Sequence, residues 1–457
     1  MDPTRPAWHD SVDQTTMEGA IPMHVRKWQI GAVAVGLLAV TGCGVPGGGG
    51  SNDAGDTEEG DGSIQILGAI PEGEAVGLNA ALKTFTDETG IKVTYTPSTD
   101  FTTEIRTKVN GNDAPDIALF PQPGLVGDLT ESGDTLPLDD LIDVDKLDDT
   151  MIPGLMDSVE IDDKTYGVPI RVSMKSLVWT PKNFEESGYK TPTTWDELMS
   201  LQDDIIAKGQ TPWCFGAEAG ADTGWVYTDW VEEIVLRQEG PEFYDDWVNH
   251  EVPFNDPKIV QAIETMGDII NKPKNVRGGA DGTLSEPFGD SPLPLFTDPP
   301  GCEMHRQANF ITTFFPKDVQ QDLAGNVSVF ALPGNMEGGF DGTPVLGGGD
   351  MATAFTNDTD VVELMEFFAS PDFGAEWAKA GGWLSPSTEF DNSNYADPMF
   401  GEIATLLQDA DTFRFDGSDL MPAQVGAGTF WSEMNAYVGG EKSAQEAADA
   451  IEESWRG

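Results

Sequence analysis

The stretch SIQIL at Ser63–Leu67 decides the fold, because a regular alternation of strands and helices begins with it. Its apolar residues alternate and then run together, which predicts a buried strand. A helix is expected over 74–89, with one apolar face and Gly90 as its stop. Strands are expected at Ile91–Tyr95 and Asp116–Phe120. Such alternation predicts an α/β domain with a mostly parallel sheet.

The loops that follow these strands are where a ligand is expected. In sheets of this kind, ligands bind just beyond the carboxyl ends of the strands. The loops at 71–74, 99–101 and 121–124 should therefore share one rim. A further helix is expected at Phe101–Val109, beginning at that rim.

A second, helix-rich unit follows the segment Tyr166–Ile170. Thr194 and Glu197 form a capping box, since the threonine hydroxyl can accept from the third backbone N–H while the glutamate reaches back. Apolar residues then repeat at helical spacing until Lys208-Gly209. The other expected elements are helices at 229–237 and 257–270, a strand at 327–330 and mostly helices from Val361 onward.

The length and charge limit the classes of function. The chain has 457 residues, with 79 acidic and 25 basic side chains and a net charge of −54. The length predicts two or three domains. The charge excludes a general nucleic-acid binder, which needs a basic face, and disfavours docking on anionic lipid. So acidic a surface indicates solubility or tolerance of high salt.

The amino-terminal residues predict export. Residues 1–22 are interpreted as an upstream extension, and residues 23–42 as a signal peptide with a 13-residue apolar run that is too short to span a bilayer. Val40-Thr41-Gly42-Cys43 resembles a bacterial lipobox, although such motifs usually have leucine where Val40 stands. We expect lipid on Cys43, an acidic, glycine-rich tether over 43–62, and a location at the extracellular face of the membrane. A buried helix ending at a free thiol is the weaker alternative.

The other cysteines and the histidines point away from metal and nucleophile chemistry. Cys214 and Cys302 form an even pair in an exported chain, which predicts one disulfide, with two separate buried thiols as the alternative. No zinc-type spacing is present, and neither His250 nor His305 lies in a nucleophile motif. We expect no metal, no cofactor and no catalytic residue.

Several short motifs carry a family resemblance over residues 63–457. Their order and spacing resemble those of the solute-binding proteins of bacterial ABC importers for sugars. The motifs are APDI at Ala114–Ile117, YGVP at Tyr166–Pro169, KSLVW at Lys175–Trp179 and PTTWDEL at Pro192–Leu198. Within the family, the chain resembles the α-glucoside-binding branch in FPQPG at Phe120–Gly124, TDW at Thr228–Trp230, PPGC at Pro299–Cys302 and HRQ at His305–Gln307.

The resemblance implies a maltose-binding-protein-like fold, in which two α/β lobes close on one ligand. The first lobe is expected at 63–171 with 341–387, and the second at 172–340 with 388–457. Hinge closure would supply the two conformations that a membrane permease can distinguish. The expected partners are a sugar and the permease subunits of an ABC importer, the lipid on Cys43 supplies the membrane contact, and the protein is expected to be a monomer.

A neutral sugar needs aromatic faces for its C–H surfaces and polar side chains for its hydroxyls. Tryptophans in loop or element-end contexts are candidates for the first role, whereas Trp195, Trp247 and Trp377 have the neighbours of core residues. The resemblance adds Phe310, and the rim positions supply most of the polar candidates. The expected ligand-binding residues are Glu74, Asp100, Phe101, Gln122, Lys175, Trp225, Asp229, Trp230, Arg306, Phe310, Asp350, Trp383 and Trp431.

Two alternatives remain open at this stage. The first is an exported glycosidase, which needs two carboxylates at a defined separation that no motif here fixes. The second is a protein of the same fold that binds a peptide or a polyamine. Gly347–Gly349 is not a phosphate cradle, since it lacks the P-loop pattern, and we expect its glycines to let the backbone cross between lobes.

Overall fold

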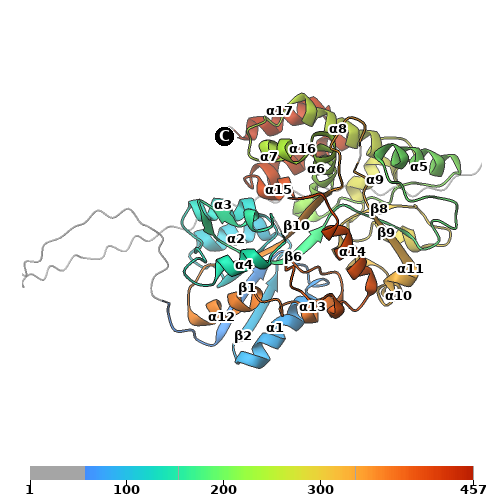
Figure 1. The fold of residues 1–457 in the computed structure, drawn as a ribbon. Helices are drawn as coiled ribbons and strands as arrows, with labels where there is room; N and C mark the ends of the chain where they lie inside the picture. Colours follow the sequence, from blue (N-terminus) through green and yellow to red (C-terminus); the bar gives the residue numbers. More distant parts are fainter. Residues whose placement is uncertain (1–56, 153, 335, 456–457) are drawn as a thin grey trace, which may run out of the picture. The chain divides into compact units, whose positions relative to one another are not determined.

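The computed structural model describes residues 57–455 with the exception of 153 and 335 (Figure 1). The predicted extension, the signal peptide, Cys43 and the first part of the tether lie outside the described residues. None of the helices in the described part of the chain combines the length and the apolar character needed to cross a membrane.

The first sheet confirms the predicted strand and helix alternation. Strands β1 (Ser63–Gly68), β2 (Lys92–Pro97) and β3 (Ile117–Phe120) run parallel, with β1 between the other two. The crossover helices are α1 (Ala75–Thr89) and α2 (Phe101–Asn110). Helix α1 ends as predicted at Gly90, which adopts the left-handed conformation with φ 83° that glycine accepts at low cost.

Three further strands complete this sheet and were not predicted. The long strand β10 (Pro344–Ala354) pairs antiparallel with β3 and with β6 (Val168–Met174), and parallel with β11 (Thr412–Phe415). The sheet is therefore mixed: β10 pairs antiparallel with β3 and β6, and the other strand pairs are parallel. Strand β6 is buried along almost its whole length, so its sequence lacks the alternation that reveals a half-exposed strand.

The glycines Gly347–Gly349 lie inside β10. A Cβ on Gly348 would stand 3.0 Å from Cε of Lys175, and a Cβ on Gly349 would overlap the carbonyl oxygen of Arg171. Both glycines therefore allow β10 to approach the chain that carries Arg171 and Lys175 closely.

The second sheet is small and antiparallel. Strand β7 (Leu177–Pro181) lies between β8 (His305–Arg306) and β9 (Val327–Ala331). Next to it, helix α5 (Trp195–Ala207) begins at the predicted cap, where the Thr194 hydroxyl accepts from the N–H of Glu197 at 3.2 Å. The Glu197 carboxylate reaches back to the N–H of Thr193 at 2.8 Å, one residue further than a capping box requires.

Helix α6 (Trp225–Glu239) is buried over twelve consecutive residues and is central to the helix-rich part. It packs against α8 (Pro257–Ile270) and α16 (Trp431–Val438), and α17 (Ala444–Trp455) packs against α8 and α16, so that Figure 1 shows these helices as one group. The apolar core accordingly forms two clusters, one around the first sheet and one around α6.

The remaining elements are short and connect these layers. They are α3 (Pro123–Glu131), α4 (Val144–Thr150), β4 (Glu160–Ile161), β5 (Lys164–Thr165), α7 (Pro241–Val248), α9 (Gly279–Ser285), α10 (Lys317–Gln320), α11 (Leu323–Asn326), α12 (Thr359–Phe368), α13 (Ala375–Ala380), α14 (Pro398–Gln408), α15 (Gly417–Leu420), a π-helical turn at Val425–Phe430 and short 3-10 turns, among them Gly220–Asp222 and Asn309–Phe314.

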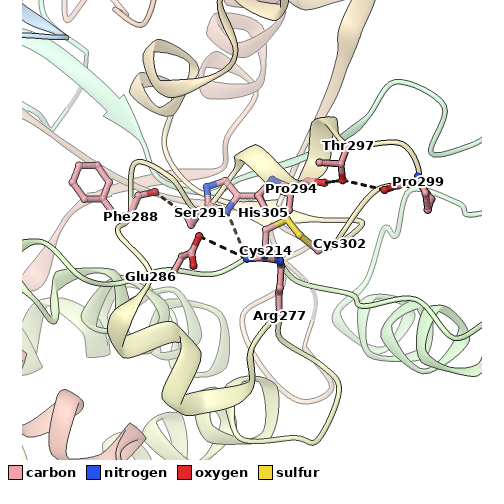
Figure 2. Close-up of a disulfide and its surroundings, with 10 residues drawn as sticks. All are labelled: Cys214, Arg277, Glu286, Phe288, Ser291, Pro294, Thr297, Pro299, Cys302 and His305. Carbon is pink, nitrogen blue, oxygen red and sulfur yellow. Dashed lines mark hydrogen bonds and ion pairs between the residues drawn. A yellow bond between two sulfur atoms is a disulfide. The ribbon is translucent and has the colours of Figure 1, made fainter.

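The structure joins Cys214 and Cys302 in a disulfide (Figure 2). The ring nitrogen Nδ1 of the buried His305 lies 3.1 Å from the Cys214 carbonyl oxygen. The disulfide closes a long loop that includes Phe288, whose carbonyl accepts from the Ser291 hydroxyl at 2.7 Å. The bridge thus ties the end of a glycine- and proline-rich segment, just before β8, to the chain that follows α5.

Candidate ligand-binding site

One cavity of about 270 Å³ opens between the rim of the first sheet and the residues around α6. The predicted rim loops supply one side of it, including Glu74, Phe101 and Gln122. Strand β6 and Lys175 just beyond it supply the floor, and α6, α16 and α15 with the residue before it supply the other side. The lining residues are Ala69, Pro71, Glu74, Ser98, Thr99, Phe101, Thr102, Pro121, Gln122, Arg171, Ser173, Lys175, Ala219, Asp222, Trp225, Phe288, Phe310, Gly349, Asp350, Asp416, Asp419 and Trp431.

Strand geometry explains the floor of this cavity. Arg171, Ser173 and Lys175 are spaced by two residues along and just beyond β6, so an extended chain turns all three to the same face. The two cations therefore stand in one row, with the small serine between them. Lys175 was predicted as a site residue, whereas Arg171 and Ser173 were not.

Arg171 holds two predicted carboxylates. Its Nη1 lies 2.8 Å from Oε2 of Glu74, its Nε contacts Oδ2 of Asp350, and its guanidinium stands 5.9 Å from the centre of the Phe310 ring. Burial would lower the pKa of Arg171, but Asp350 and Glu74 together raise it, so the charge is retained. The guanidinium thereby positions acidic groups and an aromatic ring of the cavity at once.

Lys175 is surrounded by three carboxylates. Its ammonium contacts Asp416 and lies 3.0 Å from Oδ1 of Asp229 and 3.8 Å from Oδ2 of Asp419. Burial would lower the pKa of Lys175, but Asp229 and Asp416 raise it well above its usual range. The same ammonium stands 5.7 Å from the centre of the Trp225 ring, which joins the charged floor to the aromatic wall.

That aromatic wall consists of Trp225, Phe288, Phe310 and Trp431. The Trp225 ring packs edge-on against Phe288 at 5.4 Å and lies 6.2 Å from Phe310. Gly224 makes the approach to Trp431 possible, because a Cβ there would stand 2.6 Å from the Trp431 carbonyl oxygen. Flat rings beside carboxylates suit a ligand with apolar C–H faces and hydroxyl edges.

Five of the predicted site residues do not line the cavity, and their surroundings explain why. Asp229 and Arg306 lie behind Lys175, completely buried, with Nη1 of Arg306 3.2 Å from Oδ2 of Asp229. Trp230 is 0% exposed and packs edge-on against Trp213 at 5.4 Å. These residues support the site from behind, so their predicted direct contact with a ligand has no counterpart in the structure.

Trp383 and Asp100 are the other two. Trp383 is fully buried, its indole N–H donates to the carbonyl of Ile170 at 3.0 Å and its ring stacks on Trp377 at 6.0 Å. Asp100 is exposed next to the lining residues Thr99 and Phe101. The cavity does bring together the other eight predicted residues, which are Glu74, Phe101, Gln122, Lys175, Trp225, Phe310, Asp350 and Trp431.

Sequence reasoning missed several lining residues. Arg171 and Ser173 carry a usable signal, their spacing of two from Lys175, but only if β6 is recognised as a strand. Phe288, Asp416 and Asp419 come from irregular or very short segments whose position depends on tertiary packing. No group of three or more histidine, cysteine or carboxylate side chains among the described residues is arranged to hold a metal ion.

Comparisons with known proteins identify relatives of this chain. The chain is 40% identical to the osmoprotective compounds-binding protein GgtB of Synechocystis sp., over 94% of this chain and all of the relative. It is 36% identical to the alpha-glucosides-binding periplasmic protein AglE of Rhizobium meliloti, over 81% of this chain and 82% of the relative.

Solved structures establish the fold. The bacterial solute receptor AcbH superposes with a TM-score of 0.75 at 15% identity, covering 87% of this chain and 99% of that one. Maltose-bound MalE3 of T. maritima superposes with a TM-score of 0.65 at 17% identity, covering 86% and 99%. The predicted maltose-binding-protein-like fold is thereby confirmed. A family model matches residues 71–372, and the chain therefore belongs to the bacterial extracellular solute-binding proteins.

Proposed function

We propose that this protein captures a neutral glycoside, an α-linked glucoside of about two units, and delivers it to the permease of an ABC importer. The observation that carries the proposal is the cavity itself, in which an aromatic wall faces carboxylates held by Arg171 and Lys175. A sugar needs both surfaces at once, because its C–H faces are apolar and its hydroxyls are strong hydrogen-bond donors.

The relatives support the choice of ligand. AglE is described as binding alpha-glucosides and GgtB as binding osmoprotective compounds, and together they favour a small glucoside that also serves as a compatible solute. So acidic a chain suits a cell that meets high salt, where such a solute is needed.

The proposal includes the mechanics of delivery. The lobes, at 63–171 with 341–387 and 172–340 with 388–457, close on the ligand, and the permease responds to the closed form. Lipid on Cys43 holds the protein, as a monomer, at the extracellular face of the membrane. A Cys43→Ala variant that stays with the membrane fraction would contradict the anchor.

A thermal-shift screen tests the ligand class. Maltose, trehalose, sucrose, raffinose, galactose, glycine betaine and spermidine are added separately to the purified protein, since a ligand that prefers the folded state raises its melting temperature. We expect the glucosides to raise it and betaine and spermidine not to. A shift with spermidine alone would overturn the proposal, and steady release of glucose from any disaccharide would identify a glycosidase instead.

A further inference from the structure

Asp419 occupies an unusual place in the cavity. It lies in the short helix α15, which the π-helical turn at Val425–Phe430 contacts so closely that a Cβ on Gly426 would overlap the Ser418 carbonyl oxygen. The Asp419 side chain is 12% exposed and lines the cavity, 3.8 Å from the Lys175 ammonium of the floor. It is therefore an acid that a ligand can reach, although most of it is shielded from water.

The Lys175 ammonium cannot pair closely with all the carboxylates around it, and the geometry shows which carboxylate has the fewest partners. Both oxygens of Asp229 face cations, Lys175 at 3.0 Å and Arg306 at 3.2 Å. Asp416 contacts Lys175 with one oxygen and accepts from the Ser418 hydroxyl at 2.7 Å and the Asp419 N–H at 2.9 Å with the other.

Glu232, the next acid in the cluster, is also satisfied. It accepts from the backbone N–H groups of Gly417 at 2.9 Å and Ser418 at 3.0 Å. Asp419 has only the Lys175 ammonium at 3.8 Å, and within the described residues no hydrogen bond reaches its carboxyl group. Asp419 is thus the acid of this cluster with the fewest partners among the described residues.

We propose that Asp419 is a specificity-determining residue that stays a neutral carboxylic acid and donates a hydrogen bond to an oxygen of the ligand that has no hydrogen of its own. The proposal rests on the proposed function, since a glycoside offers two such oxygens, in its ring and in its glycosidic link. The proton stays on Asp419 throughout, so binding needs no proton exchange with solvent.

The chemistry of the cavity explains why such a donor is needed. The two cations of the floor, Arg171 and Lys175, already donate to carboxylates, so only part of their N–H groups remains for a ligand. Glu74, Asp350 and Asp416 offer acceptors, which suit hydroxyls but would repel a ring oxygen. A neutral carboxylic acid supplies a donor that an ionised one cannot.

Electrostatics support the same assignment. Burial raises the pKa of Asp419 well above its usual range, Asp416 raises it further, and Lys175 opposes both. The charged or titratable groups around it are Lys175 beyond β6, Asp229 and Glu232 of α6, Asp416 of α15, Asp350 of β10 and, against Glu232, Tyr244 of α7.

A ligand-free experiment tests the protonation. An acid whose pKa is raised on folding binds more protons in the native state, so it reduces stability as the pH rises from its unfolded pKa toward its folded one. Relative to Asp419→Asn, the wild type should lose up to about tenfold in its folding equilibrium constant per pH unit as the pH rises above about 4, the usual pKa of an aspartate. Asp140→Asn, at an exposed position outside the cavity, is the matched control.

Equal pH dependence of wild type and Asp419→Asn would overturn the proposal, whatever the ligand is. If Asp419→Asn does not fold, Asp419→Ala gives the same comparison, because both substitutions remove the titrating group.

Calorimetry with trehalose, maltose and sucrose tests the donor role. We expect Asp419→Asn, which keeps an N–H donor, to bind within about threefold of wild type, and Asp419→Ala to bind about fivefold to tenfold more weakly, as expected for one lost hydrogen bond. Wild-type affinity should fall above the folded pKa of Asp419, whereas that of Asp419→Asn should not. Equal affinity of all three proteins would overturn the donor role. Failure of every sugar to bind wild type would overturn the proposed function, and the ligand-free experiment would still decide whether Asp419 is protonated.

Discussion

At the scale of single residues, Trp225 and Trp230 provide a matched pair on one helix. Trp225 is partly exposed in the cavity wall, and Trp230 is sealed between Trp213, Phe215 and the Arg306 guanidinium. We expect Trp225→Ala to weaken sugar binding by about 1–3 kcal/mol, as for other aromatic anchors, with little change in melting temperature. Calorimetry and thermal unfolding measure the two effects separately.

Trp230→Ala serves as the counterpart, because removing a fully buried indole should cost about 3–5 kcal/mol of unfolding free energy. Should Trp230→Ala unfold at the wild-type temperature, or Trp225→Ala bind like wild type, the assignment of cavity wall and core would be wrong.

This pair also shows where sequence reasoning stops at the residue scale. Trp225 follows a glycine and Trp230 follows an aspartate, so local context predicted both as ligand contacts. Five positions apart on a helix, their side chains point in different directions, and only the packing of α6 decides which one meets the cavity. Asp229 and Arg306 lie outside the cavity lining, and sequence could not reveal this because it does not distinguish a buried ion pair from a ligand-binding pair.

His305 gives a prediction about pH. Burial and the nearby charge of Arg306 lower its pKa to about 4, although the hydrogen bond to the Cys214 carbonyl opposes them. The native state therefore binds fewer protons than the unfolded one, and stability should be lost as the pH falls from about 6.5 toward 4. NMR of the imidazole, assigned by comparison with His305→Asn, should find a neutral ring at pH values where a free histidine is half protonated, and a midpoint near the free value would contradict the assignment.

At the scale of elements, substitutions in β10 test the role of its glycines. In an ordinary strand, replacing glycine by alanine stabilises by about 0.5–1 kcal/mol. Gly349→Ala should instead destabilise by about 1–3 kcal/mol, because its Cβ meets the rigid backbone of β6. Gly348→Ala meets only the flexible end of Lys175, so it should keep most of its stability and lose sugar affinity. Chemical denaturation of both variants checks this, and a stabilised Gly349→Ala would refute the close approach.

The disulfide is the second element to test. It joins positions 88 residues apart, and closing a loop of that size restricts the unfolded chain. The double variant Cys214→Ala with Cys302→Ala should lose about 2–5 kcal/mol of unfolding free energy. Because the loop carries Phe288, sugar affinity should fall as well. A variant as stable as the oxidised wild type in denaturant titrations would count against this role.

The elements also differ in how well sequence predicts them. Helices α1 and α5 and strand β2 were predicted because each has a solvent side, so that polar and apolar residues alternate with the period of the element. Strands β1 and β3 were predicted from short apolar runs, although β3 is buried throughout. Strands β6 and β7 are buried on both faces and show no such period. Because β6 was not predicted as a strand, Arg171 and Ser173 were not predicted as part of the cavity floor. Lys175 was the only floor residue predicted.

At the scale of the whole molecule, the family and the fold were within reach of the sequence because they depend on many weak motifs in a fixed order. The site residues could be predicted only in part, because the cavity is lined by residues from segments as distant in sequence as Glu74 and Trp431. The order of strands and helices predicts which loops form the rim of a parallel sheet, but it does not predict which residues of α15 and α16 face that rim.

The last prediction follows from the net charge of the chain. With 79 acidic and 25 basic side chains, repulsion between like charges exceeds the attraction within ion pairs, and folding brings the like charges closer together. Raising the salt from about 0.1 M to about 1 M shortens the screening length from about 10 Å to about 3 Å, which relieves this repulsion between exposed charges. The melting temperature should therefore rise over this range, and by similar amounts in sodium, potassium and tetramethylammonium chloride, because screening does not depend on the identity of the cation. A rise confined to one cation would indicate a specific ion site instead. A melting temperature that falls with salt would mean that ion pairs such as those of Arg171 and Lys175 dominate the electrostatic free energy of folding, rather than the surplus of acids.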